Sequence, residues 1–244
     1  MKVGGRLFYI GAGTSGRLGV LDAAECPPTY GVDKGLVVGI MAGGDNAMFT
    51  AQEGAEDSLE LAAKDLAYYN LSEKDSVIGL AASGRTPYVL GGLRYARQVG
   101  ALTGSISCVK NAEISEAADF PIEAVTGAEA IMGSTRMKAG TAQKLILNMI
   151  STSVMIKLGK VYQNYMVDVK PTNKKLVVRS KNMIRTLTGV DEERAEQLYE
   201  ASGHNVKKAL VMEIMNVDRE SAEVALSKGD GHIKCAIQYL GGDV

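Results

Sequence analysis

Two turns rich in glycine and hydroxyl side chains could together bind an anion. They are Gly11-Ala12-Gly13-Thr14-Ser15-Gly16-Arg17 and Ala82-Ser83-Gly84-Arg85-Thr86-Pro87, and each follows an apolar run typical of a strand. Glycines let backbone N–H groups approach an anion at a helix N-terminus, and hydroxyls from two neighbouring turns can converge on one phosphate. The arginines would either contact that anion or anchor the loops. The residues that we predict here to bind a phosphorylated substrate are Gly13, Thr14, Ser15, Gly16, Arg17, Ser83, Gly84, Arg85 and Thr86.

Two other interpretations of these turns remain open. Tight strand-to-helix turns with capping side chains would explain the same residues without a ligand. The first turn also matches GxGxxG, but a dinucleotide site requires an intact strand–helix–strand unit and an acidic residue about 20 residues on. Pro27-Pro28 is expected to cut the first helix short, and the next acidic candidate, Asp45, comes late. The repetition of Ser-Gly-Arg after two strands favours phosphate over a dinucleotide.

A third polar segment, residues 133–144, opens a long apolar helix. Ser134 and Thr135 could simply cap that helix. Lys138 and Lys144, however, stand where the segment becomes apolar, and a cation is costly there unless it is paired or solvated. We therefore add Ser134, Thr135 and Lys138 to the predicted substrate-binding residues.

Several carboxylates could take part in acid–base chemistry. Glu25 is expected at the end of a short helix, where the helix dipole already places partial negative charge. An acid in an unfavourable place suggests a function, although a surface glutamate in a turn is the commoner outcome. Near the predicted start of the next helix the dipole favours acids, and spacing alone does not choose among Glu53, Glu56, Asp57 and Glu60.

The elements that must position these residues alternate between strand and helix. Apolar runs at residues 7–10, 36–41, 77–81 and 102–109 predict strands, and Pro121 places a fifth, at 120–125, at an edge or at a strand start. Helices are predicted at 16–25, 47–69 and 88–99. This order predicts an α/β fold with a doubly wound, mainly parallel sheet.

The segment 137–158 is predicted to form a helix with apolar side chains around most of its circumference. Such a helix must be buried, and only one side of it can cover the sheet. We therefore expect a homodimer whose contact includes this helix or the helical tail, while burial within one chain is an equally simple explanation.

Strand signals end after residue 161. We expect an α/β domain that binds the phosphorylated substrate at residues 1–160, a helical connector at 161–187, and a three-helix tail at 188–244 similar to ubiquitin-associated modules. Asp191 and Asp218 stand where helix N-caps belong. His204 and His232 each follow a glycine and are expected to serve turns or packing.

Composition excludes several classes of partner. Lys and Arg total 27 against 28 for Asp and Glu, so no global basic field would attract nucleic acid or an anionic membrane. No stretch is long and apolar enough for a membrane span, and the N-terminus lacks the pattern of a signal peptide. Three widely spaced cysteines fit neither a disulfide framework nor paired metal ligands, which favours a cytoplasmic protein.

Five ordered segments together resemble the N-acetylmuramic acid 6-phosphate etherase family, whose members have the sugar isomerase (SIS) fold. The segments are residues 11–17, 22–29, 53–57, 83–87 and 133–141. The resemblance implies cleavage of the D-lactyl ether of N-acetylmuramic acid 6-phosphate during cell-wall recycling, with no metal or other cofactor. It also implies that Glu25 protonates the departing lactate oxygen and that Glu56 is the second active-site acid.

The resemblance implies a mechanism in which lactate is eliminated across C2 and C3 of the open-chain sugar and water then adds. One carboxylate must act as a base toward the C2 proton and the other as an acid toward the ether oxygen, so their surroundings must differ. We assign the base to Glu56, with Glu53 and Glu129 as alternatives.

One departure from the family and two rival functions remain. Members carry a helical segment before the first strand, whereas this sequence begins almost at that strand; the expected fold does not depend on the segment. A phosphosugar sensor without activity and an aldose–ketose phosphosugar isomerase share the fold. The pair Glu25 and Glu56 favours an enzyme over the sensor, while the isomerase would share ring opening and C2 proton abstraction.

Overall fold

A computed structural model describes residues 1–50, 52, 54–169, 171 and 173–243 of the chain. The chain divides into two compact units. One comprises Met1–Cys26 and Asp33–Ser151, and the other comprises Pro27–Val32 and Thr152–Val244.

The first unit is built on a sheet in which each adjacent pair of strands is parallel. In spatial order the strands are β2 (Val37–Met41), β1 (Leu7–Gly11), β3 (Ser76–Leu80), β4 (Leu102–Ser107) and β5 (Phe120–Glu123). The predicted strands are confirmed, and β5 lies at the edge, where Pro121 removes a backbone donor. From β1 the chain goes to β2 on one side and then crosses to β3 on the other.

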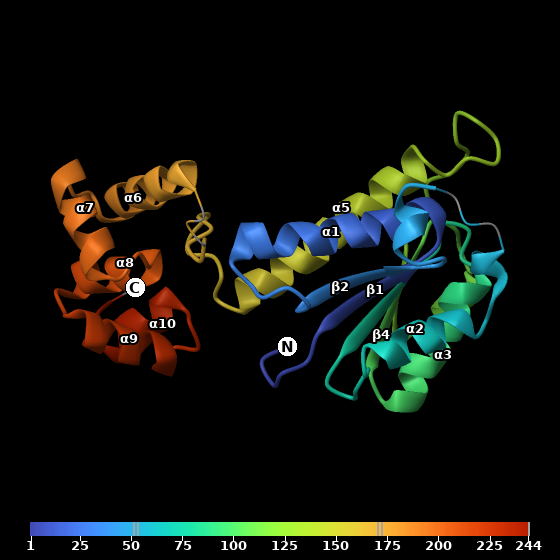
Figure 1. The fold of residues 1–244 in the computed structure, drawn as a ribbon, viewed down its shortest axis with the longest axis horizontal. Coiled ribbons are helices and arrows are strands. Elements are labelled where there is room, and N and C mark those ends of the chain that lie inside the picture. The colour runs from blue at the N-terminus through green and yellow to red at the C-terminus, as the bar shows by residue number, and fades with distance from the viewer. Residues whose placement is uncertain (51, 53, 170, 172, 244) are drawn as a thin grey trace. The chain divides into compact units, whose positions relative to one another are not determined.

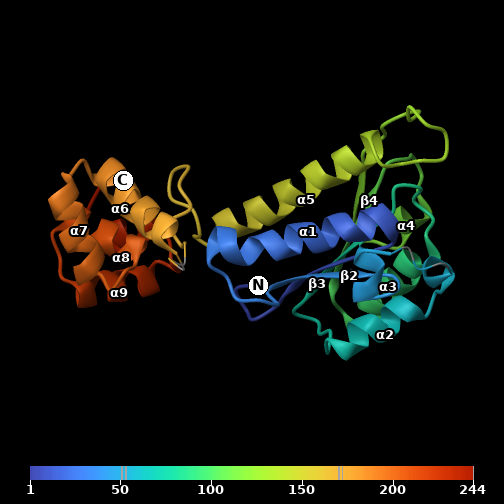
Figure 2. The same cartoon turned by 45° about the horizontal axis from the view of Figure 1, so that its top comes forward.

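Helices cover both faces of this sheet. Figures 1 and 2 show α1 (Gly13–Tyr30) and α5 (Lys138–Lys157) side by side on one face, and α2 (Leu61–Tyr68) and α3 (Pro87–Val99) on the other. Phe8, Ile10 and Val77 pack with Leu66 and Leu93 in a fully buried core. The doubly wound α/β fold predicted from the alternating pattern is confirmed.

The expectation that Pro27-Pro28 ends the first helix is wrong. Helix α1 runs through both prolines to Tyr30. Proline lacks an N–H donor and its ring crowds the carbonyl of the residue four positions earlier, yet the backbone N–H of Gly31 again donates to the carbonyl of Pro27, at 3.0 Å. Glu25 therefore lies within α1 rather than at its C-terminus, and neither the dipole argument nor the shortened-helix argument applies to this segment.

The predicted helix at 47–69 is also wrong, because the chain breaks into shorter elements. These are the 3₁₀ turns η1 (Asp45–Met48) and η2 (Ala55–Asp57) followed by α2. Gly54 adopts a left-handed φ of 76°, and Ser58 is extended with its hydroxyl accepting the N–H of Leu61 at 3.2 Å. Glu53, one of the acidic candidates, lies outside the described residues.

Helix α5 is buried on one side and exposed on another. Ala139, Gln143, Leu147, Ser151 and Met155 are buried at intervals of four residues. On the opposite side Leu145 is 50% exposed and Met149 is 59% exposed. Within one chain the apolar circumference of this helix is therefore only partly covered.

The second unit is a helical bundle. Its helices are α6 (Lys174–Thr188), α7 (Glu192–Ala201), α8 (Val206–Met215), α9 (Arg219–Lys228) and α10 (Ile233–Tyr239). Asp191 and Asp218 are N-caps, as expected, and accept the N–H groups of Arg194 and Ser221.

The tail differs from the three helices expected at residues 188–244. A fourth helix, α10, follows the glycine turn, and its Ile233, Ala236 and Ile237 are buried in the bundle core. Helix α6, expected in a separate connector, packs on α7 and α8. The proposed boundaries at 160 and 187 stay predictions.

Candidate functional site

The two Ser-Gly-Arg turns lie side by side at the carboxyl edge of the sheet. In the register of β1 with β3, Gly11 is the partner of Leu80, so one turn begins directly beside the other. The strand order reverses here, and ligands of doubly wound folds bind at such a switch point.

The first turn can offer an anion the backbone N–H groups at the start of α1 and the hydroxyl of Thr14. Gly13 adopts a left-handed φ of 53° at the start of α1, and Thr14 beside it is exposed. The first N–H groups of a helix have no partner within the helix and can bind an anion. Gly16 serves packing, because a Cβ there would lie 2.6 Å from the carbonyl oxygen of Gly11.

The side chain of Ser15 is used inside the domain. It is buried, and its hydroxyl donates to Oε1 of Gln143 on α5 at 2.8 Å. In this structure Ser15 can therefore offer an anion its backbone N–H but not its hydroxyl. Sequence reasoning missed Gln143, because a polar residue within a helical pattern carries no sign of its partner.

The second turn leaves its hydroxyls available. Thr86 is the N-cap residue of α3, yet its side chain makes no capping hydrogen bond. Ser83 and Arg85 are exposed, while Gly84 is buried with a left-handed φ of 73°. Helix capping therefore does not explain why this position carries a hydroxyl side chain.

The third polar segment meets both turns. Ala82, Cys108 and Ala139 form one buried cluster, which places the start of α5 against the second turn. A Cβ at Gly140 would lie 3.8 Å from Cγ2 of Thr14 in the first turn. The three polar segments singled out in the sequence thus lie together at this edge.

Glu129, rather than Ser134 or Thr135, caps α5. Its carboxylate oxygens each accept a backbone N–H, from Lys138 and Ala139, at 3.0 Å. These bonds, first from Ala139 and then from Lys138, lower the pKa of Glu129. The carboxylate is thereby a weaker base, which argues against it as the residue that takes the C2 proton.

The predicted cationic side chains differ in what they contact. Nζ of Lys138 donates to the carbonyl of Ala128 at 2.7 Å. Arg17 anchors a loop, since its guanidinium donates to the carbonyls of Ala47 at 2.6 Å and Met48 at 2.9 Å. Arg85 is the exposed cation of the second turn.

A cavity of about 180 Å³ joins the first turn to Glu56. Its lining residues are Ala12, Gly13, Arg17, Met41, Ala42, Ala47, Gln52, Gly54 and Glu56. The loop held by Arg17 forms one wall, so this arginine shapes the site through the backbone. Gln52 is a further polar lining residue that the sequence analysis did not select.

Glu25 lies elsewhere on the unit. It is exposed on α1, and the cavity that contains Glu56 does not include it. Residues near it belong to a buried polar contact between helices, in which Oδ1 of Asp22 accepts from Asn148 at 2.7 Å and from Ser151 at 3.1 Å. This contact fixes α1 against α5.

Burial makes the thiol of Cys26 unsuitable as a nucleophile. Burial, and then the charges of Asp22 and Glu25, raise the pKa of the Cys26 thiol to about 12. Burial and then Asp22 likewise raise the pKa of Tyr9. A thiol that stays protonated at neutral pH does not serve as a nucleophile.

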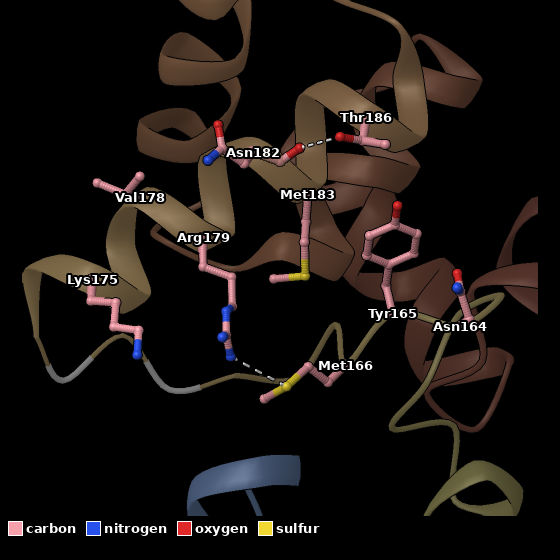
Figure 3. Close-up of a pocket in the computed structure, with 9 residues that line it drawn as sticks. All are labelled: Asn164, Tyr165, Met166, Lys175, Val178, Arg179, Asn182, Met183 and Thr186. Atoms are coloured by element: carbon pink, nitrogen blue, oxygen red, sulfur yellow. Dashed lines mark hydrogen bonds between the residues drawn. The ribbon is translucent and has the colours of Figure 1, made fainter.

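The second unit has a larger open pocket of about 570 Å³. Figure 3 shows its lining, in which Arg179 points toward Met166 with Nη1 3.8 Å from Sδ. None of the nine lining residues carries a carboxylate, so this pocket offers no acid–base pair.

Within the described residues there is no group of three or more His, Cys, Asp and Glu side chains that could hold a metal. Among those residues no helix is long and apolar enough to cross a membrane.

Two domain families match this chain. Residues 2–97 match the glucokinase regulatory protein N-terminal SIS domain, and residues 163–239 match the C-terminal lid domain of glucokinase regulatory protein. A solved protein of Escherichia coli CFT073 is 19% identical, with a TM-score of 0.49, over 66% of this chain and 73% of that chain. The fold and the domain matches define the class: this is a protein with an SIS domain followed by a lid-type helical domain.

Relatives matched over nearly the whole chain narrow the class to a family. An N-acetylmuramic acid 6-phosphate etherase of Clostridium botulinum is 63% identical over 98% of this chain and 80% of that protein. One of Exiguobacterium sp. is 59% identical over 97% of this chain and 80% of that protein. The chain belongs to the N-acetylmuramic acid 6-phosphate etherase family.

Proposed function

We propose that this protein cleaves the D-lactyl ether of N-acetylmuramic acid 6-phosphate, giving N-acetylglucosamine 6-phosphate and lactate. The observation that carries the proposal is Glu56 in one cavity with the glycine turn at the switch point, in a chain whose relatives bear the etherase name. A sensor needs the phosphate site but no carboxylate beside it.

The phosphate is proposed to sit between the first and second turns. Backbone N–H groups at Gly13, Thr14 and Ser15 begin α1, and the hydroxyls of Thr14, Ser83 and Thr86 lie at the same edge. Hydrogen bonds to a charged acceptor contribute more than neutral ones. Arg85 adds positive charge, and Ser134, Thr135 and Lys138 border the site from the start of α5.

The first half of the reaction is an elimination. The C1 aldehyde of the open-chain sugar acidifies the C2 hydrogen, and the carboxylate of Glu56 takes that proton. Loss of this proton leaves an enolate, whose electron pair then forms the C2=C3 double bond as the C3–O bond to the lactyl group breaks. Glu25 donates a proton to the departing oxygen, so lactate leaves with its own ether oxygen.

The second half is a hydration. Glu25, now ionised, takes a proton from water, and the resulting hydroxide adds to C3 of the unsaturated aldehyde. Protonated Glu56, whose carboxyl proton exchanges with solvent, returns a proton to C2, which restores both carboxyl groups. On this mechanism the enzyme is a carbon–oxygen lyase that needs no metal or other cofactor.

We also propose a homodimer that acts in the cytoplasm. Leu145 and Met149 leave an apolar side of α5 uncovered in one chain, which supports a contact between two copies.

Incubation with N-acetylmuramic acid 6-phosphate tests the function. Release of free lactate is expected, together with N-acetylglucosamine 6-phosphate. A sensor would bind the sugar without turnover, and an isomerase would convert an aldose phosphate to a ketose without releasing lactate. Binding without lactate release by the folded chain would overturn the proposal.

A further inference from the structure

We infer that Glu25 works in the active site of a second copy of this chain, so that each site combines the two turns and Glu56 of one copy with Glu25 of the other. The inference rests on the proposed function, because it asks how Glu25 and Glu56 act on one substrate.

The path of α1 carries Glu25 away from its own site. Gly16 packs on Gly11 and Met41, at the carboxyl ends of β1 and β2. One turn later α1 crosses the middle of these strands, where a Cβ at Gly19 would meet Tyr9 at 2.9 Å and one at Gly39 would meet Val20 at 2.5 Å. The helix continues toward the amino edge, as it must if β2 is to run parallel to β1.

The resulting separation is too large for one substrate to bridge. Glu25 follows Gly13 by twelve residues of continuous helix, which is about 18 Å along the axis at 1.5 Å per residue. Gly13 and Glu56 line the same cavity. A carboxyl group must lie within hydrogen-bond reach of the atom that it protonates, and Glu25 cannot reach this cavity in its own chain.

The surroundings of Glu25 fit a contact between copies. Leu21, one turn earlier on the same side of α1, is 50% exposed. On α5 Leu145 and Met149 are 50% and 59% exposed. The hydrogen bonds from Ser15 to Gln143 and from Asn148 to Asp22 show that α1 and α5 run parallel, with Leu145 level with the middle of α1.

A twofold axis perpendicular to α1 and α5 explains both the distance of Glu25 from its own site and the exposed apolar side chains on these helices. Such an axis reverses the helices, so α1 of one copy runs antiparallel to α1 of the other. If the axis passes at the level of residue 19, midway between Gly13 and Glu25, each Glu25 comes to the level of the other copy's first turn. Leu145 then lies near the axis, where an apolar side chain is covered by its own counterpart.

Heterodimers with two different tags test the inference. A heterodimer of Glu25→Gln with Glu56→Gln has one site with both carboxylates intact if Glu25 acts across the dimer, and it should release lactate at about half of the wild-type rate. Each homodimer of a single variant should be inactive. The same heterodimer would be inactive if Glu25 acted in its own chain.

The reciprocal heterodimer gives the opposite pattern. When wild type is paired with the chain carrying both Glu25→Gln and Glu56→Gln, each site lacks one carboxylate on our account, and activity should fall to background. Retention of about half of the wild-type activity in this pair would overturn the inference. A monomeric mass with full activity would overturn it as well. Failure of the proposed function itself is seen separately, because the wild-type dimer would then release no lactate.

Discussion

At the scale of single residues, the hydroxyl of Ser83 is the most direct test of the phosphate site. It is exposed in the second turn, beside the first turn at the switch point. In Ser83→Ala the sugar phosphate loses one hydrogen bond to a charged acceptor, which should weaken binding by about 1.5 to 3 kcal/mol. Calorimetry with N-acetylglucosamine 6-phosphate measures this loss. Ser227→Ala, an exposed serine in α9, is the control, and equal affinities for both variants would remove Ser83 from the site.

The proposed roles of Glu25 and Glu56 can be distinguished because the two carboxylates act in different steps of the reaction. Deprotonation at C2 precedes ether cleavage, so Glu25→Ala should abolish lactate release while still exchanging the C2 hydrogen with solvent. Glu56→Ala should lose exchange as well. Proton NMR in deuterated water follows the C2 signal of N-acetylmuramic acid 6-phosphate, with Glu73→Ala as an exposed acidic control. Normal exchange in Glu56→Ala would return the base to an unassigned residue such as Glu53.

At the scale of elements, Asp75 fastens the starts of β1 and β3. Its carboxylate accepts the N–H of Arg6 at 2.7 Å, the guanidinium of Arg6 at 2.8 Å and the N–H of Ser72 at 2.9 Å. Burial alone would raise the pKa of Asp75, but these bonds outweigh it and lower the pKa from 3.8 to about 2. The ionised form is thus stabilised by folding.

The sign of the pH dependence follows from this depressed pKa. The contribution of Asp75 is fully present above the unfolded value of 3.8 and is lost as pH falls toward about 2. It amounts to about 2 kcal/mol. Urea unfolding should show Asp75→Asn less stable than wild type near neutral pH, with the difference shrinking in acid. A difference that stays constant with pH would show that the charge of Asp75 contributes nothing.

The exposed side of α5 is predicted to touch its counterpart in a second copy. Leu145→Cys, near the proposed twofold axis and in a Cys235→Ser background, should form a disulfide-linked dimer under mild oxidation, because Cys26 and Cys108 are buried. Val178→Cys in α6 is a matched control, since Val178 is 57% exposed and Leu145 is 50% exposed. Non-reducing gels report the result, and equal cross-linking at both positions would argue against a specific α5 contact.

Elements with strong local patterns were predictable, and those set by distant partners were not. Short apolar runs ending in turn residues indicated the strands, and Asp191 and Asp218 indicated correct helix starts. The passage of α1 through Pro27-Pro28 was not predictable, because proline disfavours a helix interior and nothing in the local sequence shows that the helix hydrogen bonds resume at Gly31. The bond from Ser15 to Gln143 and the cap of α5 by Glu129 join residues that are far apart or in an irregular loop, so spacing gave no sign of them.

At the scale of the whole molecule, the net charge of −1 gives no long-range attraction for an anionic sugar phosphate. Affinity must therefore come from local donors, and the fold supplies them by bringing two turns to neighbouring strand ends. On the proposed mechanism the separation of roles follows from topology, because the strand order brings the two turns of the proposed phosphate site and Glu56 to one edge and the length of α1 takes Glu25 to the other. On our account a second copy reunites them.

The fate of the oxygen atom of water tests the central claim most directly. When N-acetylmuramic acid 6-phosphate is cleaved in ¹⁸O-labelled, deuterated water, elimination followed by hydration predicts ¹⁸O at C3 and deuterium at C2 of N-acetylglucosamine 6-phosphate, with lactate keeping its unlabelled ether oxygen. Mass spectrometry of the two products reads out all three positions. Label in the former ether oxygen of lactate, or a product without deuterium at C2, would contradict the account.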